Sequence, residues 1–380
     1  MQRKRQATYI KSSLVAGERY TAYIPKAMPP APAIKIDEVT ELLERANLAV
    51  GELNGVVDAV PEPAIINYMY VRKEAVLSSQ IEGTQSTLDD LLRFESDDSP
   101  GVPLDDAAEV STYVAALNHG LERIRGGFPL SFRLIREVHK ILLTNKRGHD
   151  KMPGEYRRTQ NWIGGTRPGN AFFIPPPPDK VISCLDDLEK FMHTKSKIPV
   201  LIKAALIHHQ FETIHPFLDG NGRAGRLLIT LYLYTAGFLS SPFLYLSLFF
   251  RQHRDLYYDK LSIPRKTGDW ESWLAFFLEG VAETAYDAKQ TLVMIQALFT
   301  HDEMKVSALG RSAPSAKVVF TFFKQKPVLN IAEITRRTGF TKPTAIITVK
   351  RLMDLGIIEN ISRKKWRQVY AYSGYIALLR

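Results

Sequence analysis

Residues 215–226 read His215-Pro216-Phe217-Leu218-Asp219-Gly220-Asn221-Gly222-Arg223-Ala224-Gly225-Arg226, and the apolar run Leu227-Leu228-Ile229 follows directly. The order Gly220-Asn221-Gly222 allows successive backbone N–H groups to point to one side, which forms a nest for an anion. A helix that starts there adds the positive end of its dipole. Arg223 and Arg226 are three residues apart and can direct forked donors at phosphate oxygens. The stretch therefore predicts a phosphate-binding loop that opens an apolar helix.

Two further residues of this stretch carry chemistry. Asp219 beside the nest would repel a phosphate unless a divalent cation stood between them, and Mg²⁺ prefers such oxygen ligands. His215 lies close enough to take a proton from a hydroxyl that attacks phosphorus, as a general base. A zinc site built with His208 and His209 is a weaker interpretation, because adjacent histidines point to different helix faces. We expect both to pack in the core or to support the loop.

Composition limits the class of protein. The chain has 380 residues, of which 45% are hydrophobic and 24% charged, as in ordinary globular proteins. The single Cys184 excludes an internal disulfide framework, is expected to be a small buried residue, and fits a cytoplasmic protein. Residues 227–250 carry no charge, but Gly237 and Ser240-Ser241-Pro242 interrupt them. Two buried helices are therefore expected there, and no membrane span.

The periodicity of apolar residues predicts a mainly α-helical fold. Helices are expected from Ile36 onward and over residues 65–82, 105–125, 131–143, 179–192 and 270–300. Residues 152–178 break the pattern with glycines, aromatics and the prolines 175–178, and we expect a β-hairpin about the turn at 164–170. The first 32 residues are proline-rich towards their end and are expected to form an extended, wrapping arm.

The C-terminal part differs from the rest in charge. Residues 305–380 contain 15 Lys and Arg against 3 acids, a net charge of +12, whereas the whole chain carries +10. After a linker at 307–315, helices are expected at 316–323, 331–338 and 343–355, followed by two strands around the basic tip Arg363-Lys364-Lys365. This order is typical of a winged helix-turn-helix, for which DNA is the favoured partner and protein an alternative.

The quoted stretch resembles the HxFx(D/E)GNGRxxR motif of the Fic (Fic/Doc) family at every defined position. The resemblance implies a protein adenylyltransferase that moves AMP from ATP to a Ser, Thr or Tyr hydroxyl of a target protein, possibly of its own chain. It implies His215 as base, Asp219 as Mg²⁺ ligand, and residues 152–178 as a flap that aligns the target segment. The implied phosphate-binding residues are Phe217, Leu218, Gly220, Asn221, Gly222, Arg223 and Arg226. Tyr257 and Tyr258 are candidates for the adenine pocket.

A second resemblance concerns control of this activity. Ser78-Ser79-Gln80-Ile81-Glu82-Gly83 fits the inhibitory pattern (S/T)xxxE(G/N) of the same family. It implies that Glu82 pairs with Arg226 and removes that arginine from ATP binding, with Ser78 and Gly83 completing the motif. An ordinary helix end at Gly83 is the alternative.

The expected protein is thus a Fic-type helical bundle with a β-hairpin flap and a C-terminal winged helix-turn-helix. The expected domains are an N-terminal helical region at 1–110, a catalytic domain at 111–300 and the winged helix at 305–380. Two other functions stay open: a DNA-binding regulator whose Fic domain senses a nucleotide, and an enzyme that removes AMP. The resemblance also allows transfer of a different phosphate-linked group, and a homodimer.

Overall fold

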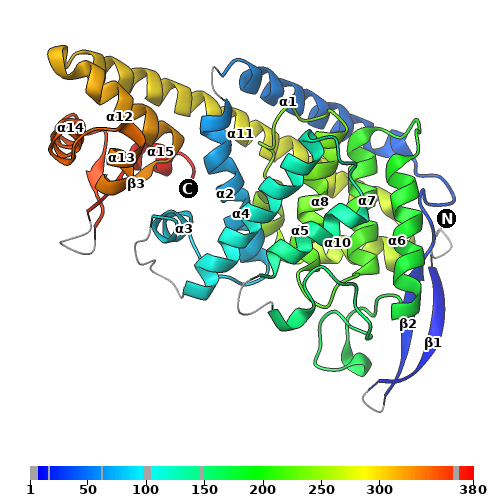
Figure 1. Cartoon of the computed structure of the whole chain (residues 1–380). Coiled ribbons are helices and arrows are strands. Elements are labelled where there is room, and N and C mark those ends of the chain that lie inside the picture. The colour runs from blue at the N-terminus through cyan, green and yellow to red at the C-terminus, as the bar shows by residue number, and fades with distance from the viewer. Residues whose placement is uncertain (1–6, 16–17, 61–62, 97–103, 145–148, 363–367) are drawn as a thin grey trace. The chain divides into compact units, whose positions relative to one another are not determined.

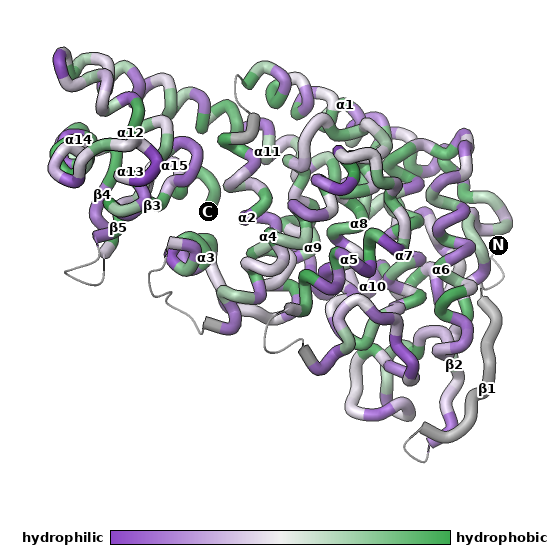
Figure 2. Tube along the Cα trace, in the orientation of Figure 1, coloured by the Kyte–Doolittle hydropathy of each residue, from purple (hydrophilic) through white to green (hydrophobic). Residues whose placement is uncertain are grey.

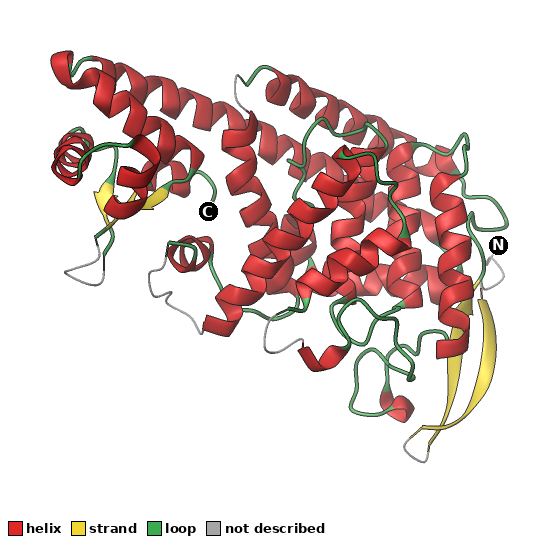
Figure 3. Ribbon diagram, viewed as in Figure 1, coloured by secondary structure: helices red, strands yellow, loops and turns green. Residues whose placement is uncertain are grey.

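The computed structural model describes residues 7–15, 18–60, 63–96, 104–144, 149–362 and 368–380. Helices dominate these residues, as expected, and strands occur in two small sheets (Figure 3). The chain divides into two compact units. Unit 1 comprises Met1–Ala49, Thr112–Leu239 and Leu246–Thr284; unit 2 comprises Val50–Ser111, Ser240–Tyr245 and Ala285–Arg380. The long helices α1 (Thr40–Asp58), α4 (Leu104–Arg125) and α11 (Trp270–Ser307) are each divided between the units.

Unit 1 is built around the buried pair α7 (Val200–Ile214) and α8 (Asn221–Thr235). Every residue of α7 from Leu201 to Ile214 is buried, including the polar Lys203, His208, His209, Gln210, Glu212 and Thr213. Around this pair lie α5 (Phe132–Leu142), α6 (Pro178–His193), α9 (Ser247–Gln252) and α10 (Arg254–Thr267) (Figures 1 and 2). Figure 2 shows the green, hydrophobic stretches along these helices.

The uncharged stretch 227–250 forms two helices joined by a loop, as predicted. α8 ends at Thr235, and α9 begins at Ser247 after the Ser240-Ser241-Pro242 break. Among the described residues, no helix combines the length and apolar character that crossing a bilayer requires. Cys184 on α6 is buried as expected, and burial raises the pKa of its thiol to about 11.

The N-terminal segment corrects one prediction. In place of an extended arm, the strands β1 (Ala7–Val15) and β2 (Glu18–Pro25) form an antiparallel hairpin with a register irregularity between Ser12 and Val15. Tyr20 and Ala22 of β2 are buried, whereas Arg19 and Thr21 face solvent. This alternation of buried and exposed residues is the period of a half-buried strand. The prolines that follow it, at 25, 29, 30 and 32, obscured the strand pattern in the sequence.

The flap also departs from the expected hairpin. Between residues 152 and 178 the only described pairing of the strand type is one bridge between Ile163 and Phe173, with the Phe173 carbonyl accepting from the Ile163 N–H at 2.8 Å. The turn is closed by Asn170, whose Oδ1 accepts from the N–H groups of Thr166 and Arg167 at 3.0 Å. Ladder pairing cannot continue because Pro175 to Pro178 lack N–H donors.

Unit 2 contains α2 (Pro63–Ile81), α3 (Leu88–Phe94) and the C-terminal segment. α2 matches the predicted helix at 65–82 and stops before Gly83, whose φ is 104°. α3 was not predicted; it begins with a reciprocal capping box between Thr87 and Asp90.

The C-terminal segment shows the predicted order of elements, with three differences. α12 (Ala313–Gln325), α13 (Ile331–Thr338) and α14 (Lys342–Asp354) precede β4 (Glu359–Asn360) and β5 (Val369–Ala371). A third strand, β3 (Val328–Asn330), pairs with β5 in the order β3-β5-β4, and α15 (Ser373–Ala377) follows. The linker expected at 307–315 is largely helical, because α11 reaches Ser307 and α12 begins at Ala313. The basic tip Arg363-Lys364-Lys365 lies outside the described residues.

Candidate functional site

The loop between α7 and α8 is held in a left-handed conformation at both ends. His215 is the C-cap of α7 with φ 50° and ψ 60°, and Gly220 is the N-cap of α8 with φ 73° and ψ 10°. Positive φ is uncommon outside glycine, so the surrounding structure must hold His215 in place. The chain changes direction between His215 and Gly220, and α8 begins at the next residue, Asn221.

Arg157, which the sequence analysis did not identify, holds the first of these caps. Its side chain donates to the carbonyl of His215 at 2.9 Å and to those of Ile214 and Pro176. Its backbone N–H donates to the Pro216 carbonyl at 2.9 Å. Burial lowers the pKa of Arg157 to about 10, so the guanidinium stays charged at neutral pH. The buried Arg157 cation thus satisfies carbonyls at the end of α7. It also links Pro176, near the end of the flap, to the loop between α7 and α8.

His139 of α5 supports the middle of the loop. Its Nδ1 accepts from the Gly154 N–H at 2.9 Å, so the ring proton lies on Nε2, which donates to the Asp219 carbonyl at 2.9 Å. The imidazole stacks on the ring of Phe217, with centroids 3.6 Å apart. Burial lowers the pKa of His139 to about 4, so the ring is neutral at neutral pH.

Asn221 closes the loop on itself. Its Oδ1 accepts from the Phe217 N–H at 2.8 Å, and its Nδ2 donates to the Phe217 carbonyl at 2.9 Å. Asn161 from the flap segment donates to the same carbonyl at 3.1 Å. The loop from Phe217 to Gly222 is therefore fixed before any ligand binds, which is what an anion nest needs in order to bind without reorganisation.

The predicted phosphate-binding residues gather at the start of α8. Gly222, Arg223 and Arg226 lie in its first two turns, with Asn221 at its first position. The Arg223 side chain is 6% exposed and its Nη2 is 3.9 Å from Asp219 Oδ1. Leu218 is partly exposed beside them. One short stretch thus supplies a helix N-terminus and two guanidinium groups.

Asp219 is the exposed acid of the loop, with 48% of its side chain accessible. Its Oδ1 accepts from the Gly220 N–H at 2.6 Å. No cluster of three or more His, Cys, Asp or Glu suited to a metal occurs among the described residues. A single carboxylate still fits Mg²⁺, which is commonly held by one or two carboxylates together with substrate phosphates.

His215 has an acidic neighbour one turn earlier on α7. Glu212 Oε2 lies 3.8 Å from His215 Nδ1, and the two side chains are 8% and 20% exposed. A carboxylate at this distance, largely shielded from water, stabilises a proton accepted by the imidazole. Glu212 was not identified from the sequence, where it is one acid in an apolar helix.

Gly225 lets α7 and α8 approach closely at this point. A Cβ added there would lie 2.3 Å from Glu212 Oε1 and 3.1 Å from Phe211 Cδ1. We therefore expect Gly225→Ala to lower the free energy of unfolding by about 1–3 kcal/mol, the usual cost of overpacking a core. Urea denaturation of the wild type and of Gly225→Ala measures this change in the free energy of unfolding.

Gly51→Ala is the matched control for this substitution. Gly51 lies inside α1 with nothing within 4 Å of an added Cβ, so alanine should stabilise the protein by about 0.5–1 kcal/mol. Equal effects of the two substitutions would show that Gly225 is not a packing constraint.

The two tyrosines proposed for adenine lie in different environments on α10. Tyr257 is 1% exposed and its hydroxyl is 2.8 Å from His208 Nε2, whereas Tyr258 is 37% exposed. His208 Nδ1 donates to the Gly225 carbonyl at 3.1 Å, so Nε2 accepts from the Tyr257 hydroxyl. His209 lies against Trp270, with ring centroids 4.5 Å apart. Both histidines are buried in the core, as the sequence analysis expected, and His208 also bonds to α8 through Gly225.

The buried His208 predicts acid sensitivity. Burial lowers its pKa to about 3 from 6.5, so the unfolded chain binds a proton more readily than the folded one. Its contribution to stability is present above pH 6.5 and is lost as the pH falls towards about 3, with a slope of up to about 1.4 kcal/mol per pH unit. His208→Gln should flatten the dependence of unfolding free energy on pH in this window. The exposed His193→Gln should leave the slope unchanged; a flattening by His193→Gln alone would refute the assignment.

The residues of the proposed inhibitory motif belong to unit 2. Ser78 on α2 is fully buried, and Glu82 and Gly83 are exposed just beyond the end of the helix. The Glu82 N–H donates to the Ser79 carbonyl at 3.1 Å. Arg226 belongs to unit 1, and its pairing with Glu82 is taken up as a proposal below.

The loop between α7 and α8 combines a helix N-terminus with two guanidinium groups, and comparison with known proteins shows which family models its residues match. Residues 40–122 match the model described as "Fic/DOC family N-terminal", and residues 129–233 match that of "Fic/DOC family". The chain therefore contains both Fic/DOC family domains, and the second includes the whole loop from His215 to Arg226.

Curated relatives resemble the chain in sequence, and solved structures resemble it in fold. The chain is 32% identical over 160 residues to the protein adenylyltransferase Fic of Aedes aegypti, covering 41% of this chain and 28% of the relative. It is 26% identical over 282 residues to the protein adenylyltransferase Fic of Drosophila melanogaster, and this match covers 72% of this chain and 51% of the relative. The chain spans about half the length of these relatives or less. A Fic family protein from Desulfovibrio desulfuricans has the same fold, with a TM-score of 0.56 and 19% identity over 91% of this chain and 98% of that one. The structure of Fic-1 from C. elegans matches with a TM-score of 0.51 and 21% sequence identity, and the match covers 69% of this chain and 75% of that one.

Proposed function

We propose that the protein transfers AMP from ATP to a Ser, Thr or Tyr hydroxyl of a protein. The observation that carries this proposal is the loop from His215 to Arg226, in which a restrained histidine is followed by a structured glycine loop at the start of α8. Relatives named protein adenylyltransferase support it. ATP is therefore the proposed substrate.

In this reaction the target hydroxyl attacks the α-phosphorus of ATP. A bond from the hydroxyl oxygen to phosphorus forms, the bond between the α- and β-phosphate groups breaks, and pyrophosphate leaves. His215 accepts the hydroxyl proton, and Glu212 at 3.8 Å stabilises the resulting imidazolium. The loop between Phe217 and Gly222, through N–H groups other than those of Phe217 and Gly220, binds the phosphates together with Arg223 and Arg226.

Asp219 would hold Mg²⁺ together with phosphate oxygens. The ion would neutralise charge on the phosphates. The exposed side chain of Asp219 at the edge of the nest is the observation that supports this role.

We further propose that Glu82 inhibits the enzyme by pairing with Arg226. A carboxylate bound to this guanidinium takes the place of an outer phosphate and disfavours productive ATP. The position of Glu82 directly after α2, within the Ser78–Gly83 pattern, supports such a role.

Labelled ATP tests the transfer itself. The wild-type chain and Glu82→Gly, each with ATP and Mg²⁺, should retain label from the α-phosphate on protein and none from the γ-phosphate. Retention of γ-label would instead make the protein a kinase. Absence of both labels, with and without a lysate as the source of targets, would overturn the proposal.

A second candidate function, DNA binding, concerns the C-terminal segment. α13, the turn at Gly339 and α14 followed by β4 and β5 are the elements of a winged helix-turn-helix. α14 exposes Lys342 and Lys350 in a segment of net charge +12. The combination supports contact with DNA phosphates.

For this function we expect duplex DNA binding by the full chain to weaken linearly with the logarithm of salt concentration. Lys350→Ala should reduce the salt slope by about 1, because one phosphate contact is lost. Fluorescence anisotropy with a labelled duplex measures it. The exposed Lys195→Ala in unit 1 should leave the slope unchanged, and binding without salt dependence would contradict DNA as the partner.

A further inference from the structure

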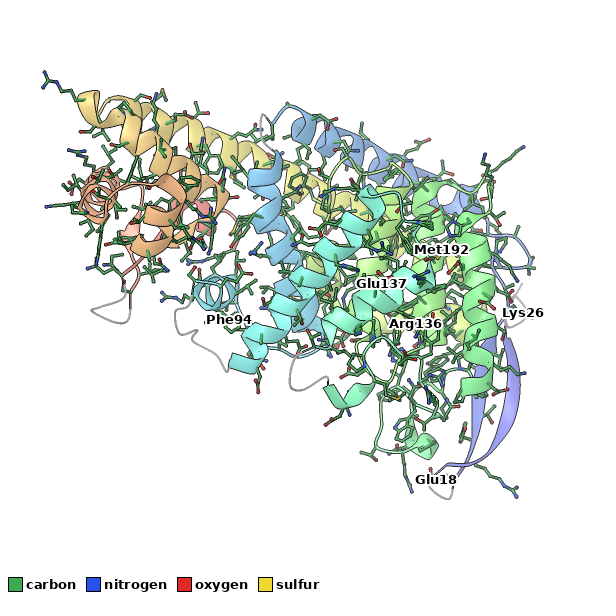
Figure 4. The ribbon with its side chains drawn as sticks, in the orientation of Figure 1. Glu18, Lys26, Phe94, Arg136, Glu137 and Met192 are labelled. Atoms are coloured by element: carbon green, nitrogen blue, oxygen red, sulfur yellow. The ribbon has the colours of Figure 1, made fainter. Side chains whose placement is uncertain are left out.

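The N-terminal hairpin of β1 and β2 is bonded to the flap, residues 152–178, at two points. Glu18 Oε2 accepts from the Gly169 N–H at 2.7 Å, and Glu18 Oε1 pairs with Arg167 Nη1 at 2.7 Å. Further along β2, the Tyr23 N–H donates to the Ile174 carbonyl at 3.0 Å. Figure 4 labels Glu18 at the end of the hairpin, beside the flap. The hairpin precedes residue 40, so it lies outside both family matches.

Between these two anchors β2 and the flap enclose a slot. Both segments run in the same direction from the first anchor to the second, and α10 lies against them. The slot has a volume of about 220 Å³. At about 30 Å³ per water molecule, this is room for about seven waters or one large side chain. The lining used below comprises Thr21, Tyr23, Phe172, Phe173, Arg265 and Lys266.

The aromatic wall of the slot faces water. Phe172 is 86% exposed, whereas Phe173 is held between Tyr23, at 5.5 Å between ring centroids, and Arg265. Single exposed apolar residues are common, so Phe172 alone indicates little. Its place on the rim of a defined slot is what marks a contact surface.

The backbone of β2 can add to this surface. Tyr23 directs its N–H to the flap, and residues two apart on a strand direct their backbone groups to the same side. Thr21 therefore directs its N–H and carbonyl into the slot, where an extended segment can pair with them.

The floor of the slot carries two cationic side chains, Arg265 and Lys266; burial lowers the pKa of Arg265 to about 10, and the nearby carboxylate of Glu212 partly offsets this shift. Arg265 is 7% exposed and fixed: its Nε donates to Thr213 Oγ1 at 3.0 Å, and its guanidinium lies 4.1 Å from the Phe173 ring centroid. Lys266 follows it at the surface. No carboxylate lines the slot among the described residues. Thr213 lies on α7, two residues before His215. The hydrogen bond from Arg265 to Thr213 therefore connects the floor of the slot to the helix that ends at the proposed base.

We propose that this slot docks the target protein, taking one large apolar side chain of an extended segment with an acidic residue next to it. Phe172 and Phe173 contact the apolar side chain, Thr21 pairs with the backbone, and Arg265 and Lys266 face the carboxylate. Glu18 is a positioning residue that fixes the flap. The inference rests on the proposed transfer to a protein, and it names the chemistry of the partner.

The test is direct binding of peptides to the full chain without ATP. The probe is a fluorescein-labelled heptapeptide with a central Phe between two Glu and one Tyr as acceptor; a matched peptide carries Lys in place of Glu. We expect the acidic peptide to bind roughly tenfold more tightly, because like charges replace opposite ones in the second. Phe172→Ala should weaken the binding of both peptides, and Lys266→Glu should remove the preference between them. Ile182→Ala, at an exposed apolar position on α6, should retain both the affinity and the preference.

The outcomes separate docking from transfer. Equal binding of both peptides, an affinity unaffected by Phe172→Ala, or a preference unaffected by Lys266→Glu overturns the slot. Loss of self-association in Phe172→Ala without peptide selectivity assigns the slot to a second copy of the chain and also overturns it. A selective peptide that is bound but never receives AMP, even with Glu82→Gly, supports the slot while the transfer itself fails.

Discussion

Replacing the His215 imidazole is expected to reduce AMP transfer by about 10²–10⁴-fold, the usual contribution of a positioned general base. The backbone of His215 has φ 50°, a conformation that alanine adopts poorly and asparagine tolerates. His215→Asn is therefore the cleaner variant, and His215→Ala accompanies it. The rate of AMP transfer, by mass spectrometry of the modified protein, is the measurement.

The control for this prediction is a variant with an intact loop. His193→Asn, at an exposed position on α6, should transfer AMP at the wild-type rate. Thermal unfolding of His215→Asn should match the wild type within a few degrees, which shows that the loop survives. Wild-type transfer by a folded His215→Asn chain would exclude His215 as the base.

The local parts of this site are predictable because their signals are adjacent in sequence. Gly220 and Gly222 around Asn221 indicate the nest, and the structure places a left-handed Gly220 at the start of α8. The supports are not predictable in this way. Arg157 and His139 act on residues 58 and 80 positions away, and neither belongs to a motif. A single sequence holds no signal that pairs a buried arginine with the end of a distant helix.

The strands were predicted less well than the helices, for a related reason. A helix is encoded by contacts three and four residues apart, whereas a strand depends on its partner. β2 alternates buried Tyr20 and Ala22 with exposed residues, yet its pairing with β1 and with Ile174 is set by tertiary contact. The expected flap strands shrink to one bridge because proline and glycine prevent a ladder.

Glu82→Gly is expected to raise both AMP transfer and ATP affinity. A hydrogen bond to a charged group contributes about 1.5–3 kcal/mol, so freeing Arg226 should increase productive ATP binding by about 10–100-fold. Glu82 lies beyond the end of α2 at Ile81, so glycine there costs little helix stability. Rates of AMP transfer over a range of ATP concentrations, with a nucleotide binding titration, measure both effects.

Two further variants decide whether the charge of Glu82 is responsible. Glu82→Gln keeps the shape of the side chain and removes its charge, so it should reproduce most of the increase. Gln85→Gly alters an exposed position of the same segment and should leave transfer and ATP affinity unchanged. If Glu82→Gly and Gln85→Gly behave alike, the Glu82-Gly83 sequence is an ordinary helix end. If only the two Glu82 variants gain activity and His215→Asn abolishes that gain, the inhibitory carboxylate and the base act on the same reaction.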